Sequence, residues 1–117
     1  MHGRRVDRIE EQLRIEISEI LERELADPRA HFVTVTRAKV SPDLRHARVY
    51  ISVLGGDEER KKALQGLRSA ASFVRRSLGK RLHHLRRIPE LVFDYDESLE
   101  KELRVEQLLE KIKSEGE

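Results

Sequence analysis

RKKALQGLRSAASFVRRSLGKRLHHLRR, at residues 60–87, is the stretch around which the rest of the chain is arranged. Its apolar residues recur every three or four positions, which predicts a helix with one apolar face. That face consists of Leu64, Leu67, Ala71, Val74, Leu78, Leu82 and Leu85. The opposite side carries Arg68, Ser72, Arg75, Arg76, Lys80, His83 and Arg87. The sequence thus predicts a helix that packs through leucines and presents cations to solvent.

The charge of this stretch differs from that of the remaining chain. Residues 60–87 contain ten Lys and Arg and no Asp or Glu, whereas the whole chain has 24 basic and 22 acidic residues. The other residues therefore carry 14 basic and 22 acidic side chains, a net charge of −8 against +10 for the stretch. A helix that is anchored on one face and cationic on the other suits a polyanionic partner.

Length and composition indicate one small domain. A chain of 117 residues is long enough to bury a core of its own, and the absence of cysteine excludes disulfides and thiolate chemistry. The N-terminal MHGRRVDRIEEQ lacks the apolar run of a signal peptide, and no run approaches the ~20 apolar residues of a membrane span. We therefore expect a cytoplasmic protein, and a monomer.

Upstream of the basic stretch, the pattern changes from helix to strand. Apolar residues step by threes and fours over residues 4–26, which predicts a helix that ends at Asp27-Pro28. Its first turns hold Arg4, Arg5 and Arg8, for which partner binding and a tolerated surface cluster are equally good explanations.

Residues 31–40 and 47–54 alternate with a period of two, and the turn at residues 41–45 would join these strands as an antiparallel hairpin. The cations of this hairpin have two equally good explanations: they contact a partner, or they belong to a sheet face that is simply solvated. These cations are Arg37, Lys39, Arg45, His46 and Arg48.

Downstream, Ile88-Pro89 ends the basic helix, which the periodicity draws unbroken over about residues 58–86 although two internal glycines weaken it. Residues 91–95 predict a third strand, and a final helix begins at Ser98 and frays over residues 114–117. Residues 88–117 hold ten acids and four bases, so we expect this end to lie off a phosphate-binding surface or to form a flexible arm. The order α-β-β-α(α)-β-α predicts an α+β fold with its helices on one face of a small sheet.

Catalytic and metal-binding motifs are missing from the sequence. It has no nucleophile elbow, Walker loop or dinucleotide fingerprint, and no two histidines stand four apart with a carboxylate between them. The acids Asp94, Asp96, Glu97 and Glu100 are more typical of a solvated face than of a metal site. We therefore expect neither enzymatic activity nor a cofactor or metal. The histidines are His2, His31, His46, His83 and His84.

Nucleic acid is the partner that the cations favour, because Lys and Arg on a helix surface neutralise phosphates. Aromatic residues for base stacking are scarce, so recognition should depend on the backbone and shape of RNA. Two alternatives remain open at this point. The basic helix could dock an acidic protein, or it could simply face water.

The segments at residues 24–55 and 67–100 resemble bacterial ribosome-binding factor A. The resemblance covers nearly the whole chain and rests on DPR, VTVT, VSPDLRHARVYISVLG, LGKRL and the segment from IPEL to DES. It implies a KH-like domain of type II order over residues 1–97 and a C-terminal helical extension over residues 98–117. It also implies that the central helix is two helices meeting at a kink. The family marks that kink with Ala-x-Gly, which falls here on Ala70-Ala71-Ser72, and the serine puts the sharpness of the bend in question.

The resemblance further implies a non-catalytic factor that binds the free 30S ribosomal subunit and its 16S rRNA. Such a factor assists late subunit maturation, including processing of the rRNA 5′ end, and matters most in the cold. We expect the central stretch to contact rRNA phosphates, with four outer contacts. The central residues are Arg68, Ser72, Arg75, Arg76, Lys80, Arg81, Arg86 and Arg87, and the outer ones are Arg4, Arg5, Arg8 and Arg45.

Overall fold

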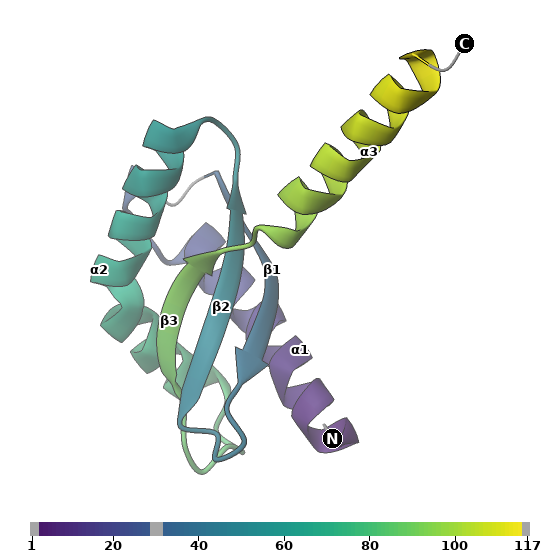
Figure 1. The fold of residues 1–117 in the computed structure, drawn as a ribbon. Coiled ribbons are helices and arrows are strands. Elements are labelled where there is room, and N and C mark those ends of the chain that lie inside the picture. Colours follow the sequence, from purple (N-terminus) through teal and green to yellow (C-terminus); the bar gives the residue numbers. More distant parts are fainter. Residues whose placement is uncertain (1–2, 29–31, 116–117) are drawn as a thin grey trace.

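One three-stranded sheet with two helices on the same face forms the body of the protein (Figure 1). The computed structural model describes residues 3–28 and 32–115, without the side chains of residues 99–104. Strand β2 lies in the middle of the sheet, antiparallel to β1 and parallel to β3. This architecture confirms the predicted α+β class and its KH-like order. The elements are α1 (Arg4–Arg23), β1 (Val33–Val40), β2 (His46–Val53), α2 (Asp57–Arg81), β3 (Glu90–Tyr95) and α3 (Ser98–Glu115).

The core lies between the sheet and the apolar faces of α1 and α2. The predicted stripe of α2 is confirmed, because Leu67, Val74 and Leu78 are fully buried and the other leucines of the stripe pack against the same cluster. Burying such side chains is the main stabilising term of the fold, and it fixes which side of each helix faces solvent. The fully buried residues include Leu13, Ile17, Ile20, Val49, Ile51, Leu67, Val74, Leu78, Leu82 and Phe93.

The turn of the hairpin is the one that the sequence predicts. The Asp43 carboxylate accepts hydrogen bonds from the Ser41 hydroxyl at 2.6 Å and from the Arg45 N–H at 3.1 Å. These bonds, that from Ser41 first, hold the pKa of Asp43 below its ordinary value. Leu44 sits at φ 60°, in the left-handed region that favours glycine or asparagine. The expected start of the first strand at His31 lies outside the described residues.

The end of α2 differs from the prediction. The helix stops at Arg81, and Leu82 has φ −113° and ψ 61°, so the expected end at residue 86 is wrong. Leu85 and Ile88 both pack against the core, which the chain achieves by leaving the helix and turning toward β3. As a result Arg86 and Arg87 belong to the loop between α2 and β3 and not to the face of the helix.

The middle of α2 corrects a second expectation. The helix runs without interruption through Ala70, Ala71 and Ser72, so two separate helices are not formed. Among the described non-glycine residues only Leu44 has a positive φ, so the chain avoids the strain that such a kink would place on serine. Figure 1 shows that the axis of α2 nevertheless changes direction about half-way along its length. The bend is therefore accommodated within one helix.

The last helix, α3, projects away from the body (Figure 1). It starts at a buried junction, where Asp96 accepts hydrogen bonds from the N–H of Ser98 at 3.0 Å and from the hydroxyls of Ser98 and Thr36. Burial raises the pKa of Asp96, but these hydrogen bonds outweigh burial and leave it below the ordinary value. The helix continues through Glu115, and the predicted fraying of residues 114–117 stays a prediction, with 116 and 117 outside the described residues. Within the described chain, no helix has the length and apolar character needed to cross a bilayer.

Candidate nucleic-acid interface

Arg81 is bound by carboxylates of α1. Its Nη1 lies 2.9 Å from Glu16 and 3.0 Å from Glu19, and its Nη2 lies 2.9 Å from Glu24. These glutamates, with Glu16 first, raise the pKa of Arg81, and only 28% of the arginine side chain is exposed. This arrangement disfavours the predicted contact of Arg81 with RNA, because the side chain is already held by three carboxylates and links α2 to α1. Glu16 and Glu19 stand three residues apart, which aims both at the same neighbour.

Arg68 and Arg75 lean toward β3. Arg68 Nη2 is 3.4 Å from both the Asp94 carboxylate and the carbonyl of Phe93, and 58% of its side chain remains exposed. Arg75 donates from Nε and Nη2 to the carbonyl of Ile88 at 3.2 and 2.9 Å. A neutral carbonyl orients a guanidinium without cancelling its charge. Both arginines therefore keep charge available to a phosphate, Arg75 more than Arg68.

A shallow hollow of about 210 Å³ lies between the middle of α2 and the edge of β3. Ser72 is exposed at its rim, and Arg75 lines it together with residues of β3. The hollow thus brings together two of the predicted contacts. The lining residues are Ala71, Ser72, Arg75, Glu90 and Leu91.

Four other predicted contacts are exposed and have no ion pair with any described residue: Arg76 and Lys80 on the last turns of α2, and Arg86 and Arg87 in the loop that follows. Each can exchange water and counterions for a phosphate without first breaking an intramolecular pair. They are among the cations that the fold leaves available to a partner.

The start of α1 adds a second group of cations. Arg4, Arg5 and Arg8 are exposed, and at 100° per residue they fall on the same side of α1 as Gln12. Gln12 Oε1 lies 3.2 Å from His84 Nε2, so the loop after α2 passes along this side of α1. The outer predicted contacts on α1 are therefore near the end of α2.

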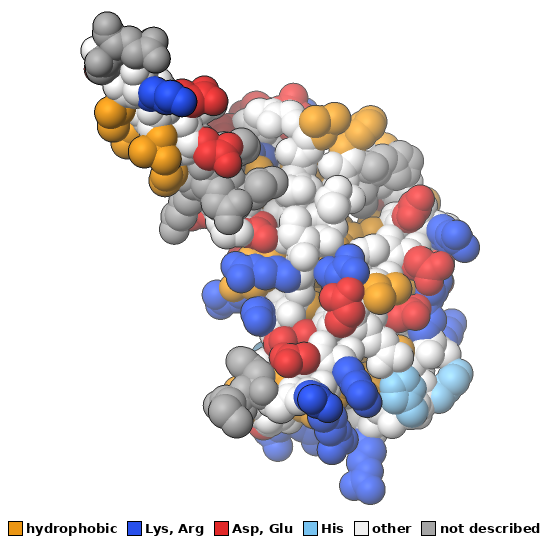
Figure 2. All heavy atoms as spheres, turned by 90° about the vertical axis from the view of Figure 1, so that its right-hand side faces the viewer, with side chains coloured by type: hydrophobic (Ala, Val, Ile, Leu, Met, Phe, Trp, Pro, Cys, Tyr) orange, Lys and Arg blue, Asp and Glu red, His pale blue; other side chains and the backbone are white. Residues whose placement is uncertain are grey.

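The hairpin turn reaches the same end of the molecule. The Arg45 carbonyl accepts the N–H of Glu90 at 2.8 Å, which joins the turn to the end of the loop after α2. The Arg45 side chain is 62% exposed, with Asp43 at 3.9 Å. Figure 2 shows Lys and Arg side chains gathered at the lower end of the molecule. We call this surface the cationic end, and it comprises Arg4, Arg5, Arg8, Arg45, Lys80, Arg86 and Arg87.

The cations of the open sheet face are paired. Arg37 lies 3.6 Å from Asp96 and over the ring of Tyr50, and Arg48 lies 3.1 Å from Asp94. Lys39 is 3.8 Å from a carboxylate of α1. Of the two explanations that the sequence left open, this arrangement favours the solvated sheet face.

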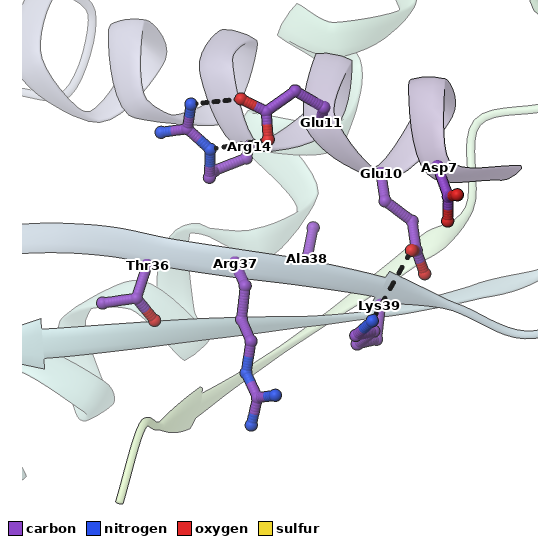
Figure 3. Close-up of a pocket in the computed structure, with 8 residues that line it drawn as sticks. All are labelled: Asp7, Glu10, Glu11, Arg14, Thr36, Arg37, Ala38 and Lys39. Atoms are coloured by element: carbon purple, nitrogen blue, oxygen red, sulfur yellow. Dashed lines mark hydrogen bonds and ion pairs between the residues drawn. The ribbon is translucent and has the colours of Figure 1, made fainter. Parts of the chain in front are cut away.

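Figure 3 shows a hollow between α1 and the edge of β1, with a volume of about 270 Å³. The Glu10 carboxylate accepts the N–H of Val40 at 2.9 Å. Figure 3 also shows the pairing of Glu11 with Arg14. Three acids and three bases line this hollow, so it offers no excess positive charge to a phosphate. Its lining is Asp7, Glu10, Glu11, Arg14, Thr36, Arg37, Ala38 and Lys39.

Two lysines of the central stretch were not among the predicted contacts. Lys61 and Lys62 are exposed on the first turns of α2, and neither forms an ion pair with a described residue. Lys61 precedes Arg68 by seven residues, which is two helical turns, so it extends the same side of the helix. That spacing was readable in the sequence. The residues that the structure describes contain no group of three metal-ligating side chains.

Comparisons with known proteins find similar sequences and similar folds. The family model described as "Ribosome-binding factor A" matches residues 5–109. A relative from Thermomicrobium roseum, named ribosome-binding factor A, is 50% identical over 98% of this chain and 88% of its own length. A crystal structure of ribosome-binding factor A from Thermus thermophilus has a TM-score of 0.69 and 29% identity, covering 77% of this chain and 93% of that one.

A second similar structure is a homology model of the Thermus thermophilus factor fitted into the cryo-EM map of a complex of that factor with 30S. It has a TM-score of 0.62 and 28% identity, and the match covers 75% of this chain and 91% of the other.

Proposed function

The chain belongs to the ribosome-binding factor A family, and from this premise we propose that it binds the free 30S ribosomal subunit through its cationic end and the adjacent last turns of α2. The observation that carries the proposal is the set of exposed cations there that have no carboxylate partner among the described residues. Arg81 and most cations of the sheet form ion pairs within the protein, whereas the unpaired side chains of the cationic end are exposed to solvent. The similarity to a factor fitted into a map of a 30S complex supports the same partner.

Within the subunit, 16S rRNA is the component that the cationic end contacts. Lysine and arginine on a convex surface bind phosphates without reading bases. The scarcity of exposed aromatic side chains near these cations supports recognition of RNA shape over stacking of single-stranded bases. The cations come from α1, the hairpin turn and the loop after α2. They are therefore spread over a surface that suits a folded RNA better than a single extended strand of RNA.

The role we propose is late maturation of the subunit, including processing of the rRNA 5′ end, with its greatest effect at low temperature. A protein that binds one arrangement of RNA more tightly than another shifts the population toward that arrangement without chemistry. Misfolded RNA helices rearrange more slowly at low temperature, so this shift in population matters most under that condition. The protein acts as a monomer in this role, and no cofactor is required.

The test measures binding to purified 30S subunits over a range of salt concentrations. The double substitution Arg76→Ala and Lys80→Ala should lower the affinity and reduce the salt slope by roughly 1.5, because each lost phosphate contact removes about 0.7 to 0.9. The matched control, Arg23→Ala with Arg48→Ala, removes two exposed cations that already have carboxylate partners at 3.6 and 3.1 Å. It should leave the slope unchanged.

Equal salt slopes for the test and control variants would refute the assigned surface. A loss of binding to subunits without any binding to protein-free 16S rRNA would instead favour an acidic protein as the partner of the basic helix.

A further inference from the structure

Helix α3 carries an apolar stripe that the rest of the chain leaves uncovered. Val105, Leu108, Leu109 and Ile112 follow the spacing i, i+3, i+4, i+7, which places them on one side of the helix. Each is 55–59% exposed. Figure 2 shows hydrophobic side chains along this projecting helix, and Figure 1 shows that it leaves the body at the end of the sheet opposite the hairpin turn. The stripe is therefore remote from the cationic end.

The chemistry of the stripe selects a protein partner over RNA. α3 has five acidic and four basic residues, so it gives phosphates no net attraction. Aliphatic side chains gain free energy only where water is replaced by another apolar surface. The outside of a folded RNA offers phosphates and sugar hydroxyls, whereas an apolar groove on a protein offers such a surface.

The size of the stripe argues against a second copy of this chain as the occupant. The four side chains, each 55–59% exposed, form an apolar patch of the size, about 300 to 600 Å², that is often functional on a monomer. A stable pair of proteins buries about 800 Å² on each partner, so the stripe supplies about half of what a dimer needs. Such a patch holds a partner when the two proteins are already brought together by another contact, because the effective concentration is then high.

We propose that the stripe of α3 docks into an apolar groove on a protein component of the same ribosomal particle whose rRNA the cationic end contacts. This inference rests on the proposed function. The 18 residues of α3 span about 27 Å at 1.5 Å per residue, so the helix reaches well beyond the body. The buried junction at Asp96, which is 5% exposed, anchors the start of α3 on the body of the protein. The protein thus makes a bivalent contact, with RNA at one end and protein at the other.

The test compares Leu108→Gln with Ile112→Gln against a control on the opposite side of α3, Gln107→Ala with Ser114→Ala. Glutamine keeps helix propensity while removing the apolar stripe. Binding is measured to 30S subunits and, separately, to protein-free 16S rRNA. We expect the stripe variant to bind subunits about 10- to 100-fold more weakly than wild type and to bind the bare rRNA as wild type does. The control should match wild type on both.

Three results would overturn the inference. The stripe variant could bind subunits as tightly as wild type, or it could lose the same factor on bare rRNA, which would make RNA the occupant. Analytical ultracentrifugation could also show a dimer of the wild type that the stripe variant abolishes, which would make a second copy the occupant. The Arg76→Ala, Lys80→Ala variant separates this inference from the proposed function, because it should lose affinity for both subunits and bare rRNA whatever the stripe contacts.

Discussion

Replacing Arg81 by methionine tests whether the central stretch divides into structural and binding cations. Methionine keeps most of the aliphatic length of the side chain, so the change removes the charge and the three contacts at 2.9, 3.0 and 2.9 Å with little loss of packing. It also leaves Glu16, Glu19 and Glu24 facing one another with Arg23, 3.6 Å from Glu19, as the remaining cation that the structure pairs with them. Both effects lower the stability of the folded state.

The magnitude follows from the exposure of the cluster. Ion pairs at the surface contribute about 0.2 to 1 kcal/mol each, and with 28% of Arg81 exposed these three pairs fall in the upper part of that range. We therefore expect a loss of ~2 kcal/mol, which lowers Tm by ~10 °C in a domain of this size. At ~1 M salt, where the Debye length is ~3 Å, the loss should fall below half, because the repulsion among the glutamates is then screened.

Urea unfolding followed by circular dichroism at low and high salt measures this difference. Arg76→Met serves as the control, because Arg76 is exposed and has no ion pair with a described residue, so its free energy of unfolding should change by less than ~0.5 kcal/mol. At a temperature where both variants are folded, Arg81→Met should bind 30S subunits within threefold of wild type. Unchanged stability together with a loss of binding as large as that of Arg76→Met would refute this assignment of Arg81.

Three further predictions concern groups outside the central stretch. Glu10→Gln should cost about 1 kcal/mol, because the carboxylate that accepts the Val40 N–H at 2.9 Å is buried, and an unchanged urea midpoint would contradict this. Asp96→Asn should destabilise the protein at pH 7. Because the folded pKa of Asp96 is lowered, its contribution is complete above the unfolded pKa and is lost as pH falls through the folded value, so wild type and variant should converge in acid unfolding curves. Leu44→Asn should change the stability by less than ~1 kcal/mol, because asparagine tolerates φ 60° better than leucine but gives up the packing of Leu44 against the core, and a larger loss in urea unfolding would count against strain at that residue.

The elements of the fold were predictable because each depends on local spacing. The leucines of α2 and the alternating residues of β2 bury as the periods of 3.6 and 2 require. The turn at residues 41–45 followed from proline and aspartate, whose preferences are equally local. The end of α2 was not predictable from period alone, because Leu85 continues the helical spacing while the tertiary structure takes it into the core by another path.

The binding surface was predictable only in part, because pairing between distant segments decides which cations remain available. Arg81 and Arg76 are alike in sequence, with basic neighbours and no nearby acid. Their fates differ because α1, whose glutamates lie 57 to 65 residues away in the chain, packs beside one and not the other. No local pattern encodes that rotation of α1 against α2. The charge pattern therefore identifies the basic segment at residues 60–87. Only the three-dimensional structure shows which of its cations are exposed and unpaired.

Several of the available cations lie at or just after the C-terminal end of α2, and this position affects how phosphate is held. A helix C-terminus presents carbonyl oxygens, and its dipole repels an anion. A phosphate near Lys80, Arg86 and Arg87 therefore gains nothing from backbone N–H groups, in contrast to sites at helix N-termini. At the end of α2 the attraction must come from side chains, and those side chains must also offset the dipole of that helix. The affinity should for this reason depend on the number of cations more than on their individual positions, and it should decline steeply with salt.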